Sequence, residues 1–144
     1  MRTKISAAWL VLAAFPLLVE AKVTATDAWV RGTVPAQKTT GAFLTLESSE
    51  DARVVGVKSP VAKTAEIHAS DMKDGVMHMQ ALDGLALPAG KRVELKPGGR
   101  HVMLMGVAKA LGEGDTVPLL FTIEDAKGKR TTLEVRAAVR PLGK

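Results

Sequence analysis

Hydrophobic and polar residues alternate along much of the chain, which is typical of β-strands with one buried face. Between residues 117 and 123 the odd positions are apolar, whereas Thr122 lies on the opposite side. Residues 131–140 show the same alternation. The two segments are separated by a short glycine-containing loop at residues 125–129. This pattern predicts a β-hairpin.

The same criteria predict further strands in the remainder of the chain. Glycine, proline and aspartate residues separate these segments at the spacing expected of a β-sandwich or barrel, and no segment has a sustained 3.6-residue period. The sequence therefore predicts a single all-β domain, a Greek-key β-sandwich. The additional strands are expected at residues 23–31, 41–46, 53–58, 64–70, 76–80, 92–95 and 101–105.

The N-terminal segment is predicted to be a secretory signal peptide. Two basic residues precede an apolar run at residues 5–19, and Ala21 provides a small residue at the expected cleavage position. The alternative is a membrane anchor, but a spanning helix needs about 20 apolar residues, and this run contains Pro16. We expect residues 1–21 to be removed, which leaves residues 22–144 as one exported domain without a membrane span.

Composition excludes several classes of function. The chain contains no cysteine, so zinc fingers, iron–sulfur clusters, blue-copper centres and cysteine nucleophiles are excluded. The net charge of +5 is mild, and basic residues are not interleaved with aromatic ones as in a nucleic-acid surface. We therefore expect no nucleic-acid partner.

Histidine and methionine residues are concentrated in the middle of the chain. All three histidines and five of the six methionines lie between residues 68 and 105. Filling of a hydrophobic core would not by itself produce this distribution, so these residues are candidates for a binding site. They are His68, His78, His101, Met72, Met77, Met79, Met103 and Met105.

Strand geometry sorts these candidates by face, because side chains two residues apart point the same way. His101, Met103 and Met105 share one face of their predicted strand, and the other face carries the apolar residues expected in the core. By the same reasoning, His68 lies opposite the core residue Ile67.

The two methionines of the segment 76–80 also share one face. His78 lies between Met77 and Met79 in sequence and therefore points to the opposite side. We expect His78 to lie outside the site.

Imidazole and thioether donors together favour Cu(I). A thioether sulfur is soft and uncharged, so it binds Cu(I) well and Zn²⁺, Mg²⁺ or Ca²⁺ poorly, while neutral imidazole suits copper. A single methionine on a strand is usually core filler, and a lone histidine is usually a hydrogen-bonded structural residue. The hypothesis therefore depends on the combination of His68 and Met79 with the His101-x-Met103 pair.

The same four residues carry a resemblance to a known family. The spacing His68-x10-Met79-x21-His101-x-Met103 matches the signature of the PCu(A)C periplasmic copper chaperones, and the similarity extends over nearly all of residues 22–144. The resemblance implies a cupredoxin-like β-sandwich that binds one Cu(I) through these four side chains. It also implies a periplasmic monomer that supplies the binuclear copper site of cytochrome c oxidase subunit II, directly or through assembly factors.

The chain departs from the family pattern at two places. Many members have a methionine directly after the first histidine, where this chain has Ala69, and some have a C-terminal tail rich in histidine and methionine, which this chain lacks. We therefore expect no second copper site, including a Cu(II) site in a tail. The sequence leaves the roles of Met72 and Met77 open, and packing is favoured for Met105.

Three alternatives to a delivery function remain at this point. The first is a copper-buffering or copper-resistance protein that uses the same site. The second is a metal-free adhesion or scaffold domain with a methionine-rich surface. The third is an enzyme using Asp27, Glu66 or Asp71, but the chain contains no nucleophile motif or phosphate-binding loop, so we expect it not to be an enzyme.

Overall fold

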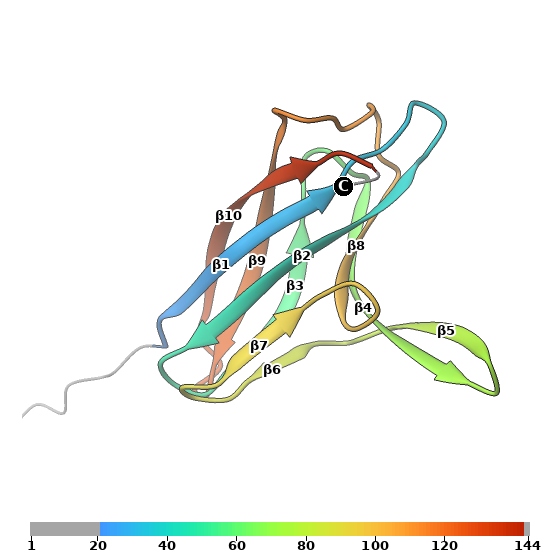
Figure 1. Ribbon diagram of the computed structural model, residues 1–144. Helices are drawn as coiled ribbons and strands as arrows, with labels where there is room; N and C mark the ends of the chain where they lie inside the picture. The colour runs from blue at the N-terminus through green and yellow to red at the C-terminus, as the bar shows by residue number, and fades with distance from the viewer. Residues whose placement is uncertain (1–20, 143–144) are drawn as a thin grey trace, which may run out of the picture.

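The computed structural model describes residues 21–142 and consists of β-strands connected by turns and loops (Figure 1). The expected signal peptide lies outside the described residues, apart from Ala21. Within the described range, no helix is long and apolar enough to cross a membrane. The strands are β1 (Val23–Arg31), β2 (Thr39–Ser48), β3 (Ala52–Lys58), β4 (Thr64–Lys73), β5 (Val76–Ala81), β6 (Leu85–Leu87), β7 (Arg92–Leu95), β8 (His101–Met105), β9 (Thr116–Asp125) and β10 (Arg130–Arg140).

The all-β prediction is confirmed, and each strand expected from the alternation is present. The structure adds β6, which the sequence analysis did not predict. This strand has only three residues, two of them buried and one exposed. Such a short segment contains too few positions for an alternating pattern to stand out from a loop.

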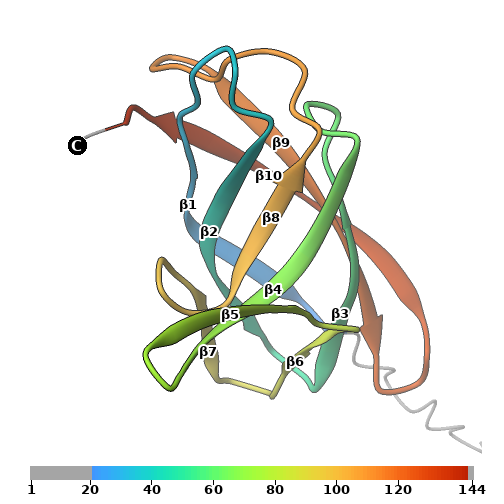
Figure 2. The same ribbon diagram turned by 90° about the vertical axis from the view of Figure 1, so that its right-hand side faces the viewer.

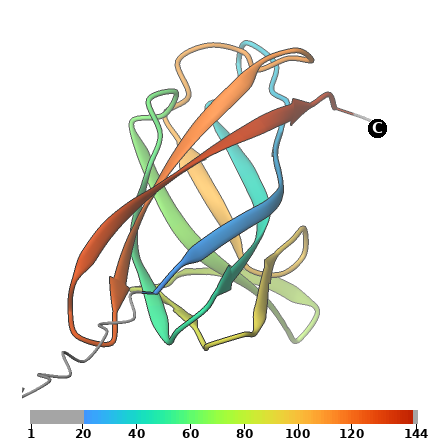
Figure 3. The ribbon, with the colours of Figure 1, turned by 90° about the vertical axis from the view of Figure 1, so that its left-hand side faces the viewer.

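The strands form one mixed sheet that curls back on itself (Figure 3). The order is β5-β4-β8-β2-β1-β10-β9-β3-β6, and β7 adds to β2 outside this path. β1 pairs in parallel with β10, and the other pairs are antiparallel. The curling brings the apolar faces of the strands together around one hydrophobic core.

Burial follows the alternation that predicted the strands. In β9 the side chains of Val117, Leu119, Phe121 and Ile123 are buried, as expected. Burial of apolar surface contributes about 25 cal/mol per Å², so this face holds β9 in one register. A shift by one residue would turn these four side chains toward solvent.

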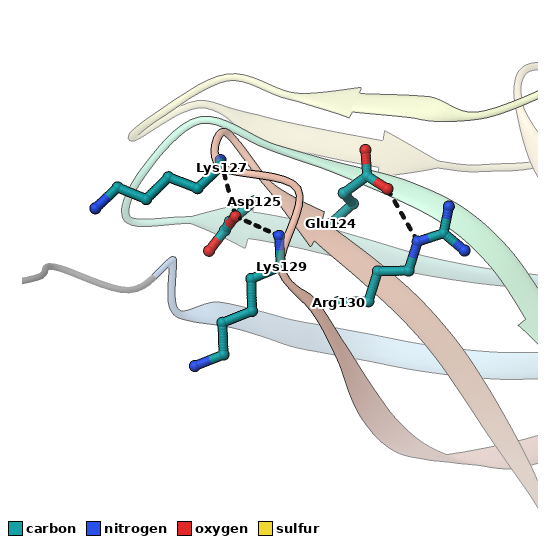
Figure 4. Close-up of polar contacts among 5 residues, drawn as sticks. All are labelled: Glu124, Asp125, Lys127, Lys129 and Arg130. Carbon is teal, nitrogen blue, oxygen red and sulfur yellow. Dashed lines mark hydrogen bonds and ion pairs between the residues drawn. The ribbon is translucent and has the colours of Figure 1, made fainter.

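The turn between β9 and β10 confirms the predicted hairpin (Figure 4). The Asp125 carboxylate oxygen Oδ1 accepts hydrogen bonds from the backbone N–H groups of Lys127 and Lys129, each at 2.9 Å. Gly128 has a φ of 82°, a backbone conformation that glycine adopts without a steric cost. Beside the turn, Arg130 Nε lies 3.0 Å from Glu124 Oε2.

The β4–β5 hairpin extends beyond the rest of the sheet (Figures 1 and 2). β4 pairs with β8 as far as His68 and pairs beyond it only with β5. We call residues 69–81 the arm. Its two turn residues, Asp74 and Gly75, have φ values of 52° and 76°, the combination that a tight two-residue hairpin turn requires. All six residues of β5 are exposed.

Candidate metal centre

The two predicted histidine ligands face each other across neighbouring strands. His68 of β4 and His101 of β8 are register partners, and their ring centroids are 5.9 Å apart. The residues beside them in sequence, Ile67 and Val102, are buried in the core. Both imidazoles therefore project from the opposite face of the sheet, as the alternation predicted.

Each imidazole has one nitrogen engaged in a hydrogen bond. Nδ1 of His101 lies 3.0 Å from the Gly99 carbonyl oxygen. Nε2 of His68 lies 2.8 Å from a Glu66 carboxylate oxygen. A carbonyl or carboxylate oxygen only accepts, so these ring nitrogens carry the proton and donate. When the rings are neutral, Nε2 of His101 and Nδ1 of His68 hold the free lone pairs.

Those two remaining nitrogens are buried and unbonded. Within residues 21–142, His68 Nδ1 and His101 Nε2 are the buried side-chain nitrogen or oxygen atoms that have no hydrogen-bond partner. A buried polar atom without a partner costs free energy. Two such atoms on facing rings, each with a lone pair, are suited to a ligand that accepts electron pairs, which is the property of a metal ion.

Met103 lies two residues beyond His101 on the same face of β8. Its register partners are Glu66 in β4 and Gly41 in β2. A Cβ atom at Gly41 would lie 2.9 Å from the tip of the Phe43 ring, so the absence of a side chain there leaves room for the Phe43 ring over Gly41. The Phe43 ring centroid is 6.4 Å from that of His101.

Aromatic and basic side chains continue this face away from the histidines. The rings of Trp29 and Phe43 are 4.5 Å apart. Arg31 lies over Phe43 at 5.4 Å, and Arg140 lies over Trp29 at 4.4 Å. Cation–π contacts of this kind are weakly stabilising. Phe43, which is 3% exposed, packs against Trp29 and Arg31 next to His101.

Met79 approaches the histidines from the arm. It is the register partner of Ser70, which lies two residues beyond His68 on the same face of β4. Met77, Met79, His101 and Met103 all border one cleft of about 310 Å³. The Met79 residue is 54% exposed, so this side of the cleft is open to solvent.

The structure thus places the four predicted site residues on one face of the sheet. Met79, His101 and Met103 line the cleft, and the ring of His68 lies beside that of His101. His78 pairs with Asp71 on the opposite face of the arm, as expected. Within the described part of the chain, no three histidine, cysteine, aspartate or glutamate side chains are grouped so that they could hold a metal ion without methionine.

Sequence reasoning missed the residues that support this face. Glu66 had a detectable signal, because it stands two residues before His68 and therefore shares its strand face. The contacts of Gly99 and Gly41 had no signal in the sequence. The Gly99 contact depends on the conformation of a loop, and the Gly41 contact depends on the close approach of the Phe43 ring.

Comparison with known proteins shows the family to which the chain belongs. The family model LpqE-like, described as “Putative lipoprotein LpqE-like”, matches residues 23–136, and the chain belongs to this family. A protein of Leifsonia xyli subsp. xyli, named “Putative lipoprotein Lxx21020”, is 30% identical over 115 residues, which cover 79% of this chain and 69% of the relative. An uncharacterized protein of Rickettsia prowazekii is 29% identical over 125 residues, with coverage of 83% and 69%.

Solved structures of PCuAC domains share the fold. The copper-bound PCuAC domain of PmoF2 has a TM-score of 0.66 at 22% identity, covering 83% of this chain and 93% of that domain. Apo-DR1885 from Deinococcus radiodurans has a TM-score of 0.60 at 28% identity, with coverage of 98% and 94%. The Cu(I) form of DR1885 has a TM-score of 0.59 at 30% identity, with coverage of 81% and 77%. The cupredoxin-like fold and the PCuAC resemblance are therefore confirmed.

Proposed function

We propose that this protein is a copper chaperone that carries one Cu(I) ion on His68, Met79, His101 and Met103. The observation that carries the proposal is the pair of buried, unbonded imidazole nitrogens on facing strands, next to a cleft bordered by two of the thioethers. The donor atoms would be Nδ1 of His68, Nε2 of His101 and the two methionine sulfurs.

The chemistry of this donor set favours Cu(I) as the cargo. An imidazole binds a metal ion in its neutral form, and thioethers carry no charge. Soft neutral donors bind Cu(I) well, whereas hard divalent cations prefer charged oxygen ligands. Glu66 and Gly99 would keep the two rings oriented while the ion arrives and leaves.

The comparisons support copper as the ligand. The PCuAC domain of PmoF2 was solved with copper, and DR1885 was solved with Cu(I). DR1885 in that form is 30% identical to this chain. Because the residues of the present site also fit Cu(I) by their own chemistry, we extend the cargo to this protein.

The open side of the cleft offers a route for transfer. Met79 is more than half exposed, so an acceptor's ligand can reach an ion bound there. No charge neutralisation holds Cu(I) to neutral ligands, and thiolates of an acceptor bind it more strongly. Transfer can therefore proceed by stepwise ligand exchange, in which one donor replaces another and copper remains Cu(I). The chain's part in this is binding and release, and no covalent chemistry is required.

We further propose that the protein is exported to the periplasm after removal of residues 1–21. The lipoprotein descriptions of the family and of the Leifsonia xyli relative support export. Cu(I) would then be delivered, by a monomer, to the binuclear site of cytochrome c oxidase subunit II or to its assembly factors. The delivery target follows from the family resemblance.

The site is tested by anaerobic Cu(I) competition titration of the purified protein. We expect one tightly bound equivalent in the wild type and a loss of at least about tenfold in affinity in each of the variants Met79→Ala and His101→Ala. His78→Ala is the matched control, because this residue lies on the opposite face of the arm. Unchanged affinity in both site variants would refute the proposed ligand set.

The main alternative, copper buffering or resistance, uses the same site and needs a test in cells. In a deletion strain, a delivery function predicts low cytochrome c oxidase activity at limiting copper that returns on copper supplementation. A buffering function predicts normal oxidase activity and poor growth on excess copper. The His101→Ala variant should fail to complement whichever defect is found.

A further inference from the structure

Three exposed methionines form a group on the arm, beyond the histidines. Met72 of β4 is the direct register partner of Met77 of β5, and Met79 lies two residues further along β5. Their exposed fractions are 62%, 54% and 54%. Methionines that fill a core are buried, so packing does not account for these three.

The register places all three on the same face of the arm. Met77 and Met79 are two residues apart on β5, and Met72 lies directly across from Met77. Directly opposed residues have Cβ atoms about 4.5–5.5 Å apart, and alternate residues along a strand are about 6.5–7 Å apart. A methionine side chain has three rotatable bonds, so the three sulfurs can converge on one ion.

This group is continuous with the proposed copper centre. Met77 and Met79 border the cleft that also contains His101 and Met103, whereas Met72 lies farther out toward the turn. Met79 therefore lies between the two imidazoles and the outer two sulfurs. An ion leaving the histidines meets Met79 first, and Met77 and Met72 next.

We propose that Met72, Met77 and Met79 form a second soft-metal site, an exchange position through which Cu(I) passes to and from the inner site. This position shares Met79 with the proposed inner site, and its role in transfer rests on the proposed function. Three thioethers without imidazole bind more weakly than the inner set, so the ion resides at the histidines and visits the arm. Each step exchanges one neutral donor for another, with no change in the oxidation state of copper.

Binding is tested with Ag(I), a redox-inert soft cation, on the whole protein labelled with ¹³C at the methionine methyl groups. Single methionine-to-leucine variants assign the signals. We expect Ag(I) to shift the Met72 and Met77 methyl signals after the first equivalent, and to do so also in a His68→Ala/His101→Ala variant. If these two signals stay still during the titration while those of Met79 and Met103 move, the second site does not exist.

Transfer is tested with the variant Met72→Leu/Met77→Leu, which keeps the size and apolar character of the side chains. We expect its affinity for the first Cu(I) to change by less than about twofold and its rate of Cu(I) transfer to a dithiol peptide to fall by about fivefold or more. Met105→Leu is the control, because it lies at the far end of β8 from His101. An unchanged transfer rate would refute the exchange role.

The two experiments separate failure of this inference from failure of the proposed function. If the inner site does not bind Cu(I), the wild type lacks the first equivalent in the competition titration, whatever Ag(I) does on the arm. If only the exchange position is wrong, the first equivalent is present and the Met72 and Met77 signals do not respond.

Discussion

His68 and His101 lie directly opposite each other on β4 and β8, with ring centroids 5.9 Å apart and one unbonded nitrogen on each ring. Their other nitrogens are engaged by Glu66 and Gly99. The backbone register sets the separation of the rings, and the hydrogen bonds set which nitrogen holds the lone pair. This pair lies within the sheet, whereas Met79 enters from the exposed arm.

Replacement of Glu66 should weaken Cu(I) binding although Glu66 is not a proposed ligand. Loss of a group that orients a ligating histidine typically costs about 10–100-fold in metal affinity. Glu66→Ala should therefore lower the affinity by at least about tenfold, and Glu66→Gln by less, because its amide oxygen can still accept the His68 hydrogen bond. Competition titration measures both, and Glu134→Gln, which changes an exposed glutamate on β10, should have no effect. Equal affinities in all three variants would contradict the orienting role.

A methyl group at Gly41 should disturb the packing of Phe43 beside the site. The added Cβ of Gly41→Ala would lie 2.9 Å from the ring of Phe43, which is buried and held by Trp29 and Arg31. Overpacking of this kind costs about 1–3 kcal/mol, so we expect lower stability in urea unfolding and weaker Cu(I) binding.

The matched control for this substitution is Gly112→Ala. An added Cβ at Gly112 would meet no atom within 4 Å. Its free energy of unfolding should therefore stay within about 1 kcal/mol of the wild type. If Gly41→Ala behaves like Gly112→Ala in both assays, the close approach of Phe43 has no functional consequence.

Cu(I) affinity should fall as the pH is lowered from about 7.5 to about 5. A protonated imidazole has no lone pair for a metal, so protons compete with Cu(I) for His68 and His101. Titrations at several pH values should show proton release on binding in the acidic range. His78→Ala should leave the pH profile unchanged, and a flat profile in the wild type would argue against histidine ligation.

The apolar face behind the site should dominate stability. Leu104 lies in β8 between Met103 and Met105 and is fully buried. Leu104→Ala should lower the free energy of unfolding by about 2–5 kcal/mol. Denaturant unfolding measures this loss, and Val34→Ala, at a position 50% exposed, should change it by less than about 0.5 kcal/mol. If Leu104→Ala lowered the free energy of unfolding by no more than Val34→Ala does, packing of β8 against the core would contribute little to stability.

The alternation of the sequence predicted most of the strands and the faces of their side chains. Period-2 patterns are local, because each side chain's face follows from its position along one strand. For this reason Val102 and Leu104 could be assigned to the core, and His101 and Met103 to the opposite face, without knowledge of their neighbours. β6 was missed because three residues are too few to show a period.

The sequence by itself determined which donors are available: three histidines, five methionines near them, and no cysteine. Only the tertiary structure decided that His68 meets His101, that Glu66 and Gly99 select the free nitrogens, and that the arm carries Met79 to the same cleft. The reason is physical. Strand faces depend on local backbone geometry, whereas pairing register and hydrogen-bond partners depend on contacts between segments far apart in the chain.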